Sequence, residues 1–480
     1  MRGMDNQMHE SRIESLNPAT GDALGYVAIS DPVEIKSKIK HAKRAGDLWA
    51  AMPSEARQQV LEEFSKMVES QSEELSQLIS DESGKPLWEA RTEVNSLKTK
   101  VAASIAAFEE RAAQVEKEVS GRLSITRFRP HGVLAVLGPF NFPMSMPNSH
   151  VMPALLAGNA VILKPSERTP LCGDRYAQIW AASGLPDGVL QVVQGGPAIG
   201  QQLVRASGVD GVLFIGSRET GLSIHQSLAG EPEKILTLEM GGSGALVIWS
   251  YEDVRSAVHI TIQSAFITAG QRCSSARRLI VKQELEHEFV ASLTEAVRNI
   301  KVGDPRDDVF FGPMIDDNAA NKFLDQVGVL EARGARILER PRKIEGCLPT
   351  FVRPGLMYEP PQAQDPDWEI FGPLLRVYRA SSISEAASIA NNTMYGLSSG
   401  IVSKSREEYG QFLASVDSGI INWNQPLTGA TTSAPFGGTK GSGNHRPAGF
   451  LSVDYCSQAI ASIEDDSPSC PTSLPPGVKY

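Results

Sequence analysis

The chain has 480 residues, more than one hydrophobic core usually holds, so we expect two or three domains. With 41% hydrophobic and 21% charged residues, its composition is that of an ordinary globular protein. The formal net charge of -10 argues against a general nucleic-acid binder, because such proteins need a basic surface to displace counterions from phosphates.

The sequence shows no signal for export or membrane insertion. The N-terminus is polar and lacks the apolar core of a secretory signal. The longest apolar stretch, Val151 to Leu163, is interrupted by Pro153, Gly158 and Asn159 and is too short to span a bilayer. We therefore expect a cytoplasmic protein with no membrane partner.

The cysteines are few, odd in number and widely spaced, which argues against a disulfide framework. No C-x-x-C, H-x-x-x-H or H-E-x-x-H pattern occurs, so we expect no metal site. A single reactive cysteine is the remaining possibility among Cys172, Cys273, Cys347, Cys456 and Cys470.

Helical periodicity dominates residues 31–118, where apolar side chains recur every three to four residues, as in Ala56–Val60–Phe64–Met67. Short apolar runs between Gly/Pro turns follow and predict a parallel α/β sheet covered on both faces. The expected strands are Val133–Leu137, Ala160–Leu163, Val189–Val193 and Val212–Ile215.

A second α/β series begins after a plausible domain boundary at Glu239–Gly244. Its expected strands are Ala245–Ile248, Arg278–Val281, Leu374–Tyr378 and Gly400–Val402. The segment Gly121–Pro130 alternates apolar and polar residues and is interpreted as a solvent-side β-ribbon. The tail from Glu464 is rich in Pro, Ser and Asp, so we expect it to be flexible.

Two residues could take part in catalysis, one as a nucleophile and one as a general base. Cys273 lies beside Arg272 among small polar residues, and a neighbouring cation can lower a thiol pKa. Glu239 ends an apolar strand before a Gly pair, where burial would raise its pKa toward that of a general base. The alternatives are a buried structural cysteine and a solvated strand-end glutamate.

Three loops could bind an oxyanion or a nucleotide. Asn141 follows a strand in a rigid Gly-Pro-Phe-Asn turn and offers a side-chain N–H, although, taken alone, this segment is better explained as an ordinary Asx turn. In Gly216–Gly221 a strand leads through a Gly-Ser loop to a helix N-terminus that suits a pyrophosphate. Lys164–Glu167 follows a strand end, where open α/β sheets bind ligands. Ordinary turn chemistry is the alternative for both of these segments.

The segment Gly396–Gly400 matches the G-x-S-x-G pattern of α/β-hydrolases. That motif requires a strand before the serine and a helix after it. Here polar residues precede the motif and an apolar strand follows, so a hydrolase is not expected.

Together, these segments resemble the aldehyde dehydrogenase superfamily, in the right order from Asn17 to about Ile463. The matching blocks are Asn17–Gly21, Gly138–Pro143, Lys164–Glu167, Gly216–Gly221, Glu239–Gly242, Gly270–Cys273, Glu369–Pro373 and Pro435–Gly438. The resemblance implies an α/β fold with a Rossmann-type cofactor domain, an α/β catalytic domain and a small oligomerisation β-ribbon. The implied ranges are 1–119 with 133–240, 241–450, and 120–132 with 451–465, followed by a tail at 466–480.

The resemblance also implies roles for single residues. Cys273 would attack the aldehyde carbon, and Asn141 with the Cys273 backbone N–H would stabilise the oxyanion. Glu239 would activate the water that hydrolyses the thioester. The implied cofactor-binding residues are Lys164, Ser166, Glu167, Gly216, Ser217, Gly221, Glu369 and Phe371.

Within the superfamily, the block Gly443–Pro447 resembles N-succinylglutamate 5-semialdehyde dehydrogenases of arginine catabolism. That substrate carries two carboxylates, so His445 and Arg446 are candidate ligands, or alternatively they hold the C-terminal segment. Glu167 would repel a 2′-phosphate, so NAD is expected rather than NADP. A homodimer or homotetramer is implied.

The sequence also departs from the family pattern. Ser243 replaces the usual Asn after the Gly pair, the usual N-terminal strand motif is missing, and Gly438–Gly441 differs from the narrower group. These departures concern the substrate more than the chemistry. Two alternatives therefore remain: a dehydrogenase for another aldehyde or semialdehyde, and a nucleotide-binding relative with little turnover.

Overall fold

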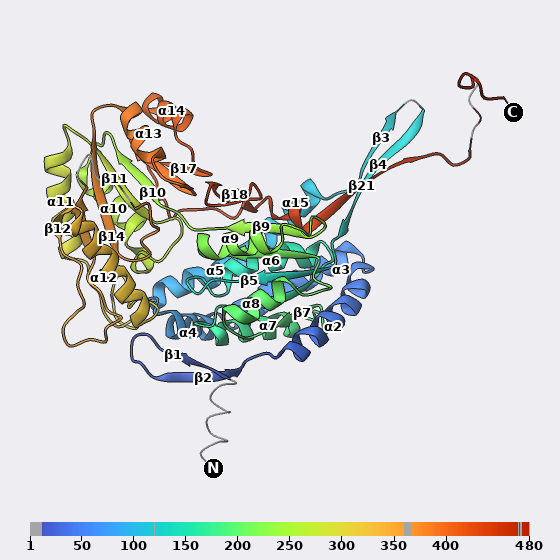
Figure 1. Cartoon of the computed structure of the whole chain (residues 1–480), viewed down its shortest axis with the longest axis horizontal. Helices are drawn as coiled ribbons and strands as arrows, with labels where there is room; N and C mark the ends of the chain where they lie inside the picture. Colours follow the sequence, from blue (N-terminus) through green and yellow to red (C-terminus); the bar gives the residue numbers. More distant parts are fainter. Residues whose placement is uncertain (1–11, 120, 360–365, 469, 471–472, 480) are drawn as a thin grey trace, which may run out of the picture.

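The computed structural model describes residues 12–119, 121–359, 366–468, 470 and 473–479. Two largely parallel sheets with their helices form the body, and a narrow β-ribbon projects from it (Figure 1). This confirms the expected α/β class. The first 11 residues, for which the sequence predicts no export signal, lie outside the described part. None of the described helices is long and apolar enough to cross a membrane.

The N-terminal region consists of a hairpin and four helices. Its elements are β1 (Arg12–Leu16), β2 (Ala23–Ala28), α2 (Pro32–Ala50), α3 (Ser54–Ser70), α4 (Ser72–Ser83) and α5 (Leu87–Arg111). The hairpin forms although the usual N-terminal motif is missing. The prediction of helix up to residue 118 is wrong at its end. β3 (Val115–Val119) is a strand, because it pairs antiparallel with the next strand along the chain.

Five parallel strands form the first sheet, in the order β7-β6-β5-β8-β9. They are β5 (Val133–Leu137), β6 (Ala160–Lys164), β7 (Leu190–Val192), β8 (Gly211–Ile215) and β9 (Ile235–Glu239). The helices between them are α6 (Ser145–Leu156), α7 (Pro170–Ala182), α8 (Pro197–Val204) and α9 (Arg218–Ser227). The strand order reverses between β5 and β8, and this switch point is where open α/β sheets bind ligands.

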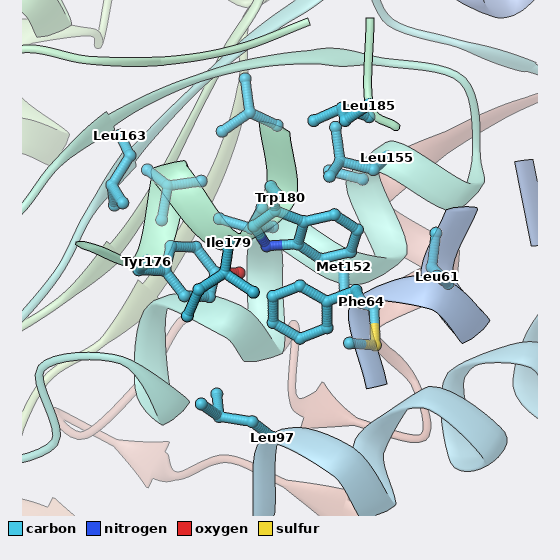
Figure 2. Packing of buried hydrophobic residues seen from close by; sticks show 14 of the residues in the cluster. Leu61, Phe64, Leu97, Met152, Leu155, Leu163, Tyr176, Ile179, Trp180 and Leu185 are labelled. Atoms are coloured by element: carbon cyan, nitrogen blue, oxygen red, sulfur yellow. The ribbon is translucent and has the colours of Figure 1, made fainter. Parts of the chain in front are cut away.

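The core of this half joins the N-terminal helices to α6 and α7. Figure 2 shows Phe64 of α3 facing Trp180 of α7. Their rings are stacked, with centroids 4.0 Å apart and an interplanar angle of 16°. Tyr176 meets the Phe64 ring edge-on at 5.9 Å. The stacking fixes the N-terminal helices against the first sheet, because aromatic pairs of this kind add to the burial energy.

Seven strands form the second sheet, in the order β12-β13-β14-β11-β10-β16-β17. They are β10 (Gly244–Ile248), β11 (Ala276–Lys282), β12 (Arg336–Glu339), β13 (Gly355–Tyr358), β14 (Leu374–Ala380), β16 (Ser398–Val402) and β17 (Ile420–Trp423). All neighbouring strands are parallel except β12 and β13. Its helices are α10 (Val254–Ala265), α11 (Glu286–Arg298), α12 (Asp317–Ala332), α13 (Ile383–Asn391) and α14 (Arg406–Ser415).

Ser398, the serine of the hydrolase-like pattern, lies within β16 and donates a hydrogen bond to the Ser274 carbonyl. It therefore does not stand on a strand-to-helix elbow. The expected boundary at Glu239–Gly244 falls between the last strand of the first sheet and the first strand of the second. Two short pairs complete the C-terminal part: β15 (Tyr395–Gly396) with β19 (Thr439–Lys440), and β18 (Pro435–Phe436) with β20 (Ala448–Gly449).

The projecting ribbon has β4 (Arg122–Pro130) at its centre, between β3 and β21 (Ser457–Glu464). Its boundaries differ from the expected 120–132 and 451–465. It begins at Val115, and α15 (Ser452–Cys456) instead packs into the body, where Tyr455 and Cys456 join the core of the first half. The described tail after β21 is exposed apart from half-buried Leu474, and it extends away from the body (Figure 1).

Candidate active site

The expected catalytic residues meet where the two sheets face each other. Asn141 follows β5, and Glu239 ends β9, so both lie at the carboxyl edge of the first sheet. Cys273 and Glu369 lie in the loops before β11 and β14, at the amino edge of the second sheet. Hydrogen bonds from Asn141 to the Gln271 carbonyl and from the Gly242 backbone to Glu369 show that the two edges are in contact.

The loop that carries Cys273 follows a short 3-10 turn, η1 (Ile267–Gly270). Arg277 of β11 is fully buried and fixes this loop through its carbonyls. It donates to the carbonyl oxygens of Gly270 at 2.5 Å and Arg272 at 2.9 Å, both in the segment just before Cys273. Burial lowers the pKa of Arg277 to about 10, and the nearby carboxylate of Glu369 opposes that shift. A charged guanidinium therefore stands close to Cys273 at neutral pH.

The Cys273 thiol is not activated in the way that the sequence suggested. Burial, and then the carboxylates of Glu369 and Glu239, raise its pKa to about 12. The expectation that Arg272 lowers this pKa is wrong, because its guanidinium pairs with Glu89 at 2.9 Å and hydrogen-bonds Thr268. Arg277 is the cation that acts on the thiol. At neutral pH the protonated thiol is therefore favoured at Cys273, and attack by its sulfur requires a base.

Glu239 is almost fully buried at the end of β9. Burial raises its carboxyl pKa well above the ordinary value, and a hydrogen bond from the Ala448 backbone partly opposes the shift. A Cβ placed on Gly437 would come within 3.0 Å of its carboxylate, so the C-terminal segment closes over this side chain. A glutamate whose pKa is raised has a more basic carboxylate than an ordinary glutamate, which suits a general base near neutral pH.

Glu369 lies against the Gly pair that follows Glu239. Its Oε1 accepts a hydrogen bond from the Gly242 backbone at 2.9 Å. Any side chain at Gly241 would strike the Glu369 carboxylate at 2.2 Å, and one at Gly242 would strike the Cys273 carbonyl at 2.5 Å. Burial raises the pKa of Glu369 to about 7. The absence of side chains at this pair allows the three loops to approach one another closely.

The Asn141 side chain reaches the same place from the other sheet. Its Nδ2 donates to the Gln271 carbonyl at 2.7 Å, and the residue is 7% exposed. An amide nitrogen carries two N–H groups, so a second donor remains for a ligand oxygen. The neighbouring Phe140 meets Phe371 edge-on at 5.9 Å, which places Phe371 across the same junction.

The expected ribose site lies at the end of β6. Lys164 is buried, and its ammonium donates to the Pro165 carbonyl at 2.9 Å and to Glu167 at 3.4 Å. Burial lowers its pKa, and Glu167 opposes the shift. An ammonium has three N–H donors, so one remains beyond these two acceptors. Ser166 accepts from the Arg168 backbone at 3.2 Å and shapes the turn.

The expected pyrophosphate site lies at the start of α9. Ser217 caps this helix by accepting from the Thr220 backbone at 3.3 Å. Side chains at Gly216 and Gly221 would strike Phe214 and Met240, respectively, so glycine allows tight packing between α9 and the sheet. The other N–H groups of the first turn point out of the helix end, where an anion is favoured. This site and Lys164 fit a dinucleotide at the carboxyl edge of the sheet.

His445 and Arg446 lie along β9 rather than at its carboxyl end. Both are exposed, and Arg446 donates to the Leu236 carbonyl at 2.8 Å. Leu236 precedes Glu239 by three residues, about 10 Å along a strand. Asn444 bonds the same strand through the Leu238 backbone and the Leu236 carbonyl. These contacts favour the alternative in which Arg446 holds the C-terminal segment.

Sequence reasoning missed the buried arginines of β11. Arg278 donates to the Ser243 carbonyl at 2.8 Å and to the Ala390 carbonyl at 2.8 Å, so it fixes the loop after Glu239. Two adjacent arginines at the start of a buried strand, directly after the cysteine block, were the available signal. The Ser243 hydroxyl is buried with no partner among the described residues, and nothing in the structure explains the substitution.

The aldehyde dehydrogenase family model matches residues 5–460. The chain is 44% identical over 467 residues to N-succinylglutamate 5-semialdehyde dehydrogenases of Shigella boydii and Escherichia coli, covering 97% of this chain and 95% of each relative. Among solved structures, aldehyde dehydrogenase 21 from Physcomitrella patens, in complex with the reaction product succinate, is 27% identical, with a TM-score of 0.88 and 96% of each chain covered. PnpE from Pseudomonas sp. WBC-3 is 28% identical, with a TM-score of 0.90, covering 97% of this chain and 96% of that one.

These matches confirm the resemblance over nearly the whole chain. The family uses NAD or NADP and oxidises aldehydes. The chain therefore belongs to the aldehyde dehydrogenase family and is an oxidoreductase that acts on aldehydes.

Proposed function

We propose that this protein oxidises N-succinyl-L-glutamate 5-semialdehyde to N-succinyl-L-glutamate with NAD, as a step of arginine catabolism. The observation that carries the chemistry is the meeting of Cys273, Glu239 and Asn141 at one junction, from loops of two sheets. The substrate is supported by the 44% identity to relatives of that name. The structure of aldehyde dehydrogenase 21 holds its reaction product succinate, which carries two carboxylates. This supports a substrate that carries a carboxylate in addition to its aldehyde.

Covalent attack is the first step. The Cys273 sulfur bonds to the aldehyde carbon, and the carbonyl oxygen becomes an oxyanion. The second N–H of Asn141 and the backbone N–H of Cys273 donate to that oxygen, a form of electrostatic stabilisation that favours the transition state. Because burial keeps the thiol protonated, Glu239 is the base available to assist it.

Hydrolysis is the last step. A water molecule attacks the thioester carbon, and the buried Glu239 carboxylate accepts its proton. The carbon–sulfur bond breaks, the acid leaves, and Cys273 is regenerated. Arg277, which bonds the Gly270 and Arg272 carbonyls just before Cys273, would keep the loop of the nucleophile in place through both steps.

When bound, the nicotinamide cofactor takes up the hydride that oxidation releases. Lys164 and Glu167 would hold its adenosine ribose, the start of α9 with Gly216, Ser217 and Gly221 its pyrophosphate, and Glu369 with Phe371 its nicotinamide end. Ser166 would shape the ribose turn. The carboxylate of Glu167 supports NAD over NADP, because it would repel a 2′-phosphate. PnpE, a structural relative at 28% identity, has also been solved with NAD.

A homodimer or homotetramer is proposed through the ribbon of β3, β4 and β21. Val119 and Ile463 are 50% and 63% exposed there, and the ribbon stands clear of the body (Figure 1). Exposed apolar side chains on a projecting sheet are typical of an interface between subunits. Sedimentation equilibrium on the wild type and on Ile463→Asp would test this role.

The substrate assignment is tested by steady-state kinetics on a panel of semialdehydes and simple aliphatic aldehydes, with NAD and with NADP. We expect the highest kcat/KM for N-succinylglutamate semialdehyde with NAD. Comparable values for aliphatic aldehydes contradict the substrate assignment and leave the reaction class intact. In Glu167→Ser, the preference for NAD over NADP should narrow.

A further inference from the structure

The turn that presents Cys273 has an unfavourable backbone conformation. Thr268, Ala269 and Gly270 are consecutive residues in the left-handed region, with φ of 59°, 52° and 68°. Non-glycine residues rarely adopt this conformation, and it persists only where the surroundings enforce it. Gly270 must lack a side chain, because a Cβ there would lie 2.3 Å from the Gly372 carbonyl. Contacts from outside the loop must therefore hold Thr268 and Ala269.

Glu89, in the first turn of α5, supplies such a contact from the other half of the molecule. It is fully buried, and its Oε1 accepts a hydrogen bond from the Thr268 hydroxyl. The same oxygen accepts from the Arg272 guanidinium at 2.9 Å, and Arg272 Nε also donates to the Thr268 hydroxyl at 2.8 Å. One carboxylate thus holds the residue that begins the left-handed stretch and the residue that precedes the nucleophile.

The cluster of Glu89, Thr268 and Arg272 also contacts the loop that carries Asn141, the proposed hydrogen-bond donor to the oxyanion. The Arg272 guanidinium lies 4.8 Å from the ring centroid of Phe142, the residue after Asn141. The ammonium of Lys85 lies 3.6 Å from the same centroid, and Lys85 pairs with Glu93, one turn after Glu89. Glu93 in turn accepts from the backbone N–H groups of Met144 and Ser145. Helix α5 therefore contacts both the nucleophile loop and the Asn141 loop.

Stability alone does not account for Glu89. Its second oxygen, Oε2, is buried with no hydrogen-bond partner among the described residues. An unpartnered buried carboxylate oxygen is costly, and buried ion pairs are often no better than apolar packing for stability. We infer that Glu89 is a positioning residue, whose bonds to Thr268 and Arg272 hold Cys273 at a fixed position relative to Asn141. This inference rests on the proposed role of Cys273.

The test compares Glu89→Ala, Glu89→Gln and Thr268→Val with the wild type. Because small misplacements of reacting groups cost about 100-fold in rate, we expect Glu89→Ala to lower kcat by about that factor. The KM for aldehyde and the Kd for NAD should change far less. Glu89→Gln, which keeps an acceptor oxygen, should recover part of the loss. Both Glu89→Gln and Thr268→Val conserve shape, so they serve if Glu89→Ala does not fold.

The coupling between the two residues gives a second readout. Combining Glu89→Ala with Thr268→Val should lower kcat no further than Glu89→Ala alone, because both changes remove the same contact. Glu82 is the matched control: it is equally buried, and it bonds the Ser15 hydroxyl and the Leu171 backbone away from the Cys273 loop. Glu82→Ala should lower the melting temperature and leave kcat near wild type.

Two outcomes overturn these assignments separately. If Glu89→Ala loses stability as Glu82→Ala does but keeps kcat, or if its effect adds fully to that of Thr268→Val, Glu89 has no positioning role. A Cys273→Ala variant measured alongside separates the two hypotheses. Turnover by Cys273→Ala overturns the proposed function itself, and the inference about Glu89 with it.

Discussion

Asn141 Nδ2 lies 2.7 Å from the Gln271 carbonyl oxygen, and this hydrogen bond joins the loop after β5 to the loop that carries Cys273. It spans the junction between the two sheets and uses one of the two N–H groups of the amide. The other N–H is the donor proposed for the oxyanion.

Replacing Asn141 with Ala should therefore lower kcat by about 100- to 1000-fold, the usual cost of losing one oxyanion donor. The Kd for NAD, measured by titration calorimetry, should stay near wild type, because the ribose and pyrophosphate sites lie on other loops. An unchanged kcat in a folded Asn141→Ala variant would remove Asn141 from the proposed mechanism.

The buried Glu239 makes stability depend on pH. Because burial raises its folded pKa above the ordinary 4.5, the folded state binds more protons than the unfolded state between these two values. Its contribution to stability is therefore lost as pH rises above 4.5, by up to about 1.4 kcal/mol per pH unit until the raised pKa is reached. Glu239→Gln removes this loss.

We expect Glu239→Gln to unfold at a higher temperature than the wild type at about pH 8, with a difference that shrinks toward about pH 5. Calorimetric melting curves across this range measure it. A constant difference in melting temperature at every pH would mean that Glu239 titrates normally in the folded protein.

The site could be predicted from sequence in its chemistry but not in its electrostatics. The order of the blocks predicted Cys273, Glu239 and Asn141 as one catalytic set, and the structure brings the loops that carry them together although they lie far apart in the chain. The sequence placed Arg272 beside the thiol, yet its side chain turns toward Glu89, which lies more than 180 residues earlier in the chain. Side-chain direction depends on such distant partners, so neighbours in sequence did not reveal it.

The fold, like the site, could be predicted only in part from the sequence. Long apolar strands such as Val133–Leu137 and Val212–Ile215 were predicted closely, because full burial on both faces leaves a continuous apolar run. The strands β12, β13 and β17 are short or carry polar residues, and only their pairing partners define them. Val115–Val119 likewise becomes a strand through β4. A local clue to Glu89 existed, because Glu89 and Glu93 fall on the apolar stripe of their helix.

The raised pKa of Cys273 predicts slow alkylation at neutral pH. The rate with iodoacetamide should keep rising to about pH 9.5 without a plateau, because only the thiolate reacts. Glu369→Gln should accelerate alkylation at about pH 8.5, since it removes a carboxylate that raises the thiol pKa. At about pH 5.5 the two proteins should differ little, because Glu369, with a pKa of about 7, is then protonated.

Peptide mass spectrometry of the Cys273 peptide measures these rates without interference from the other cysteines. A plateau near neutral pH in the wild type would show an activated thiolate and would contradict the raised pKa of the Cys273 thiol.

Arg446 gives a prediction that separates a substrate contact from a structural one. Because its guanidinium bonds the Leu236 carbonyl, Arg446→Ala should lower the free energy of unfolding by about 1 kcal/mol and leave the KM for the semialdehyde near wild type. Urea denaturation and initial-rate kinetics supply the two numbers. A large increase in KM with unchanged stability would return Arg446 to the substrate site. His445→Ala, which removes an exposed side chain, is the neighbouring control.

The most direct test of the central claim is to trap the thioester. Glu239→Gln, which lacks the base for hydrolysis, is mixed with the semialdehyde and NAD at about pH 9, where solvent hydroxide can deprotonate the thiol in place of Glu239. The mixture is then quenched in acid, digested and analysed by mass spectrometry. We predict one acyl group on the peptide that contains Cys273, in near-stoichiometric amount, with none formed when NAD is omitted. An acyl group on another residue, or sustained turnover in Cys273→Ala with no adduct at all, would contradict covalent catalysis by Cys273.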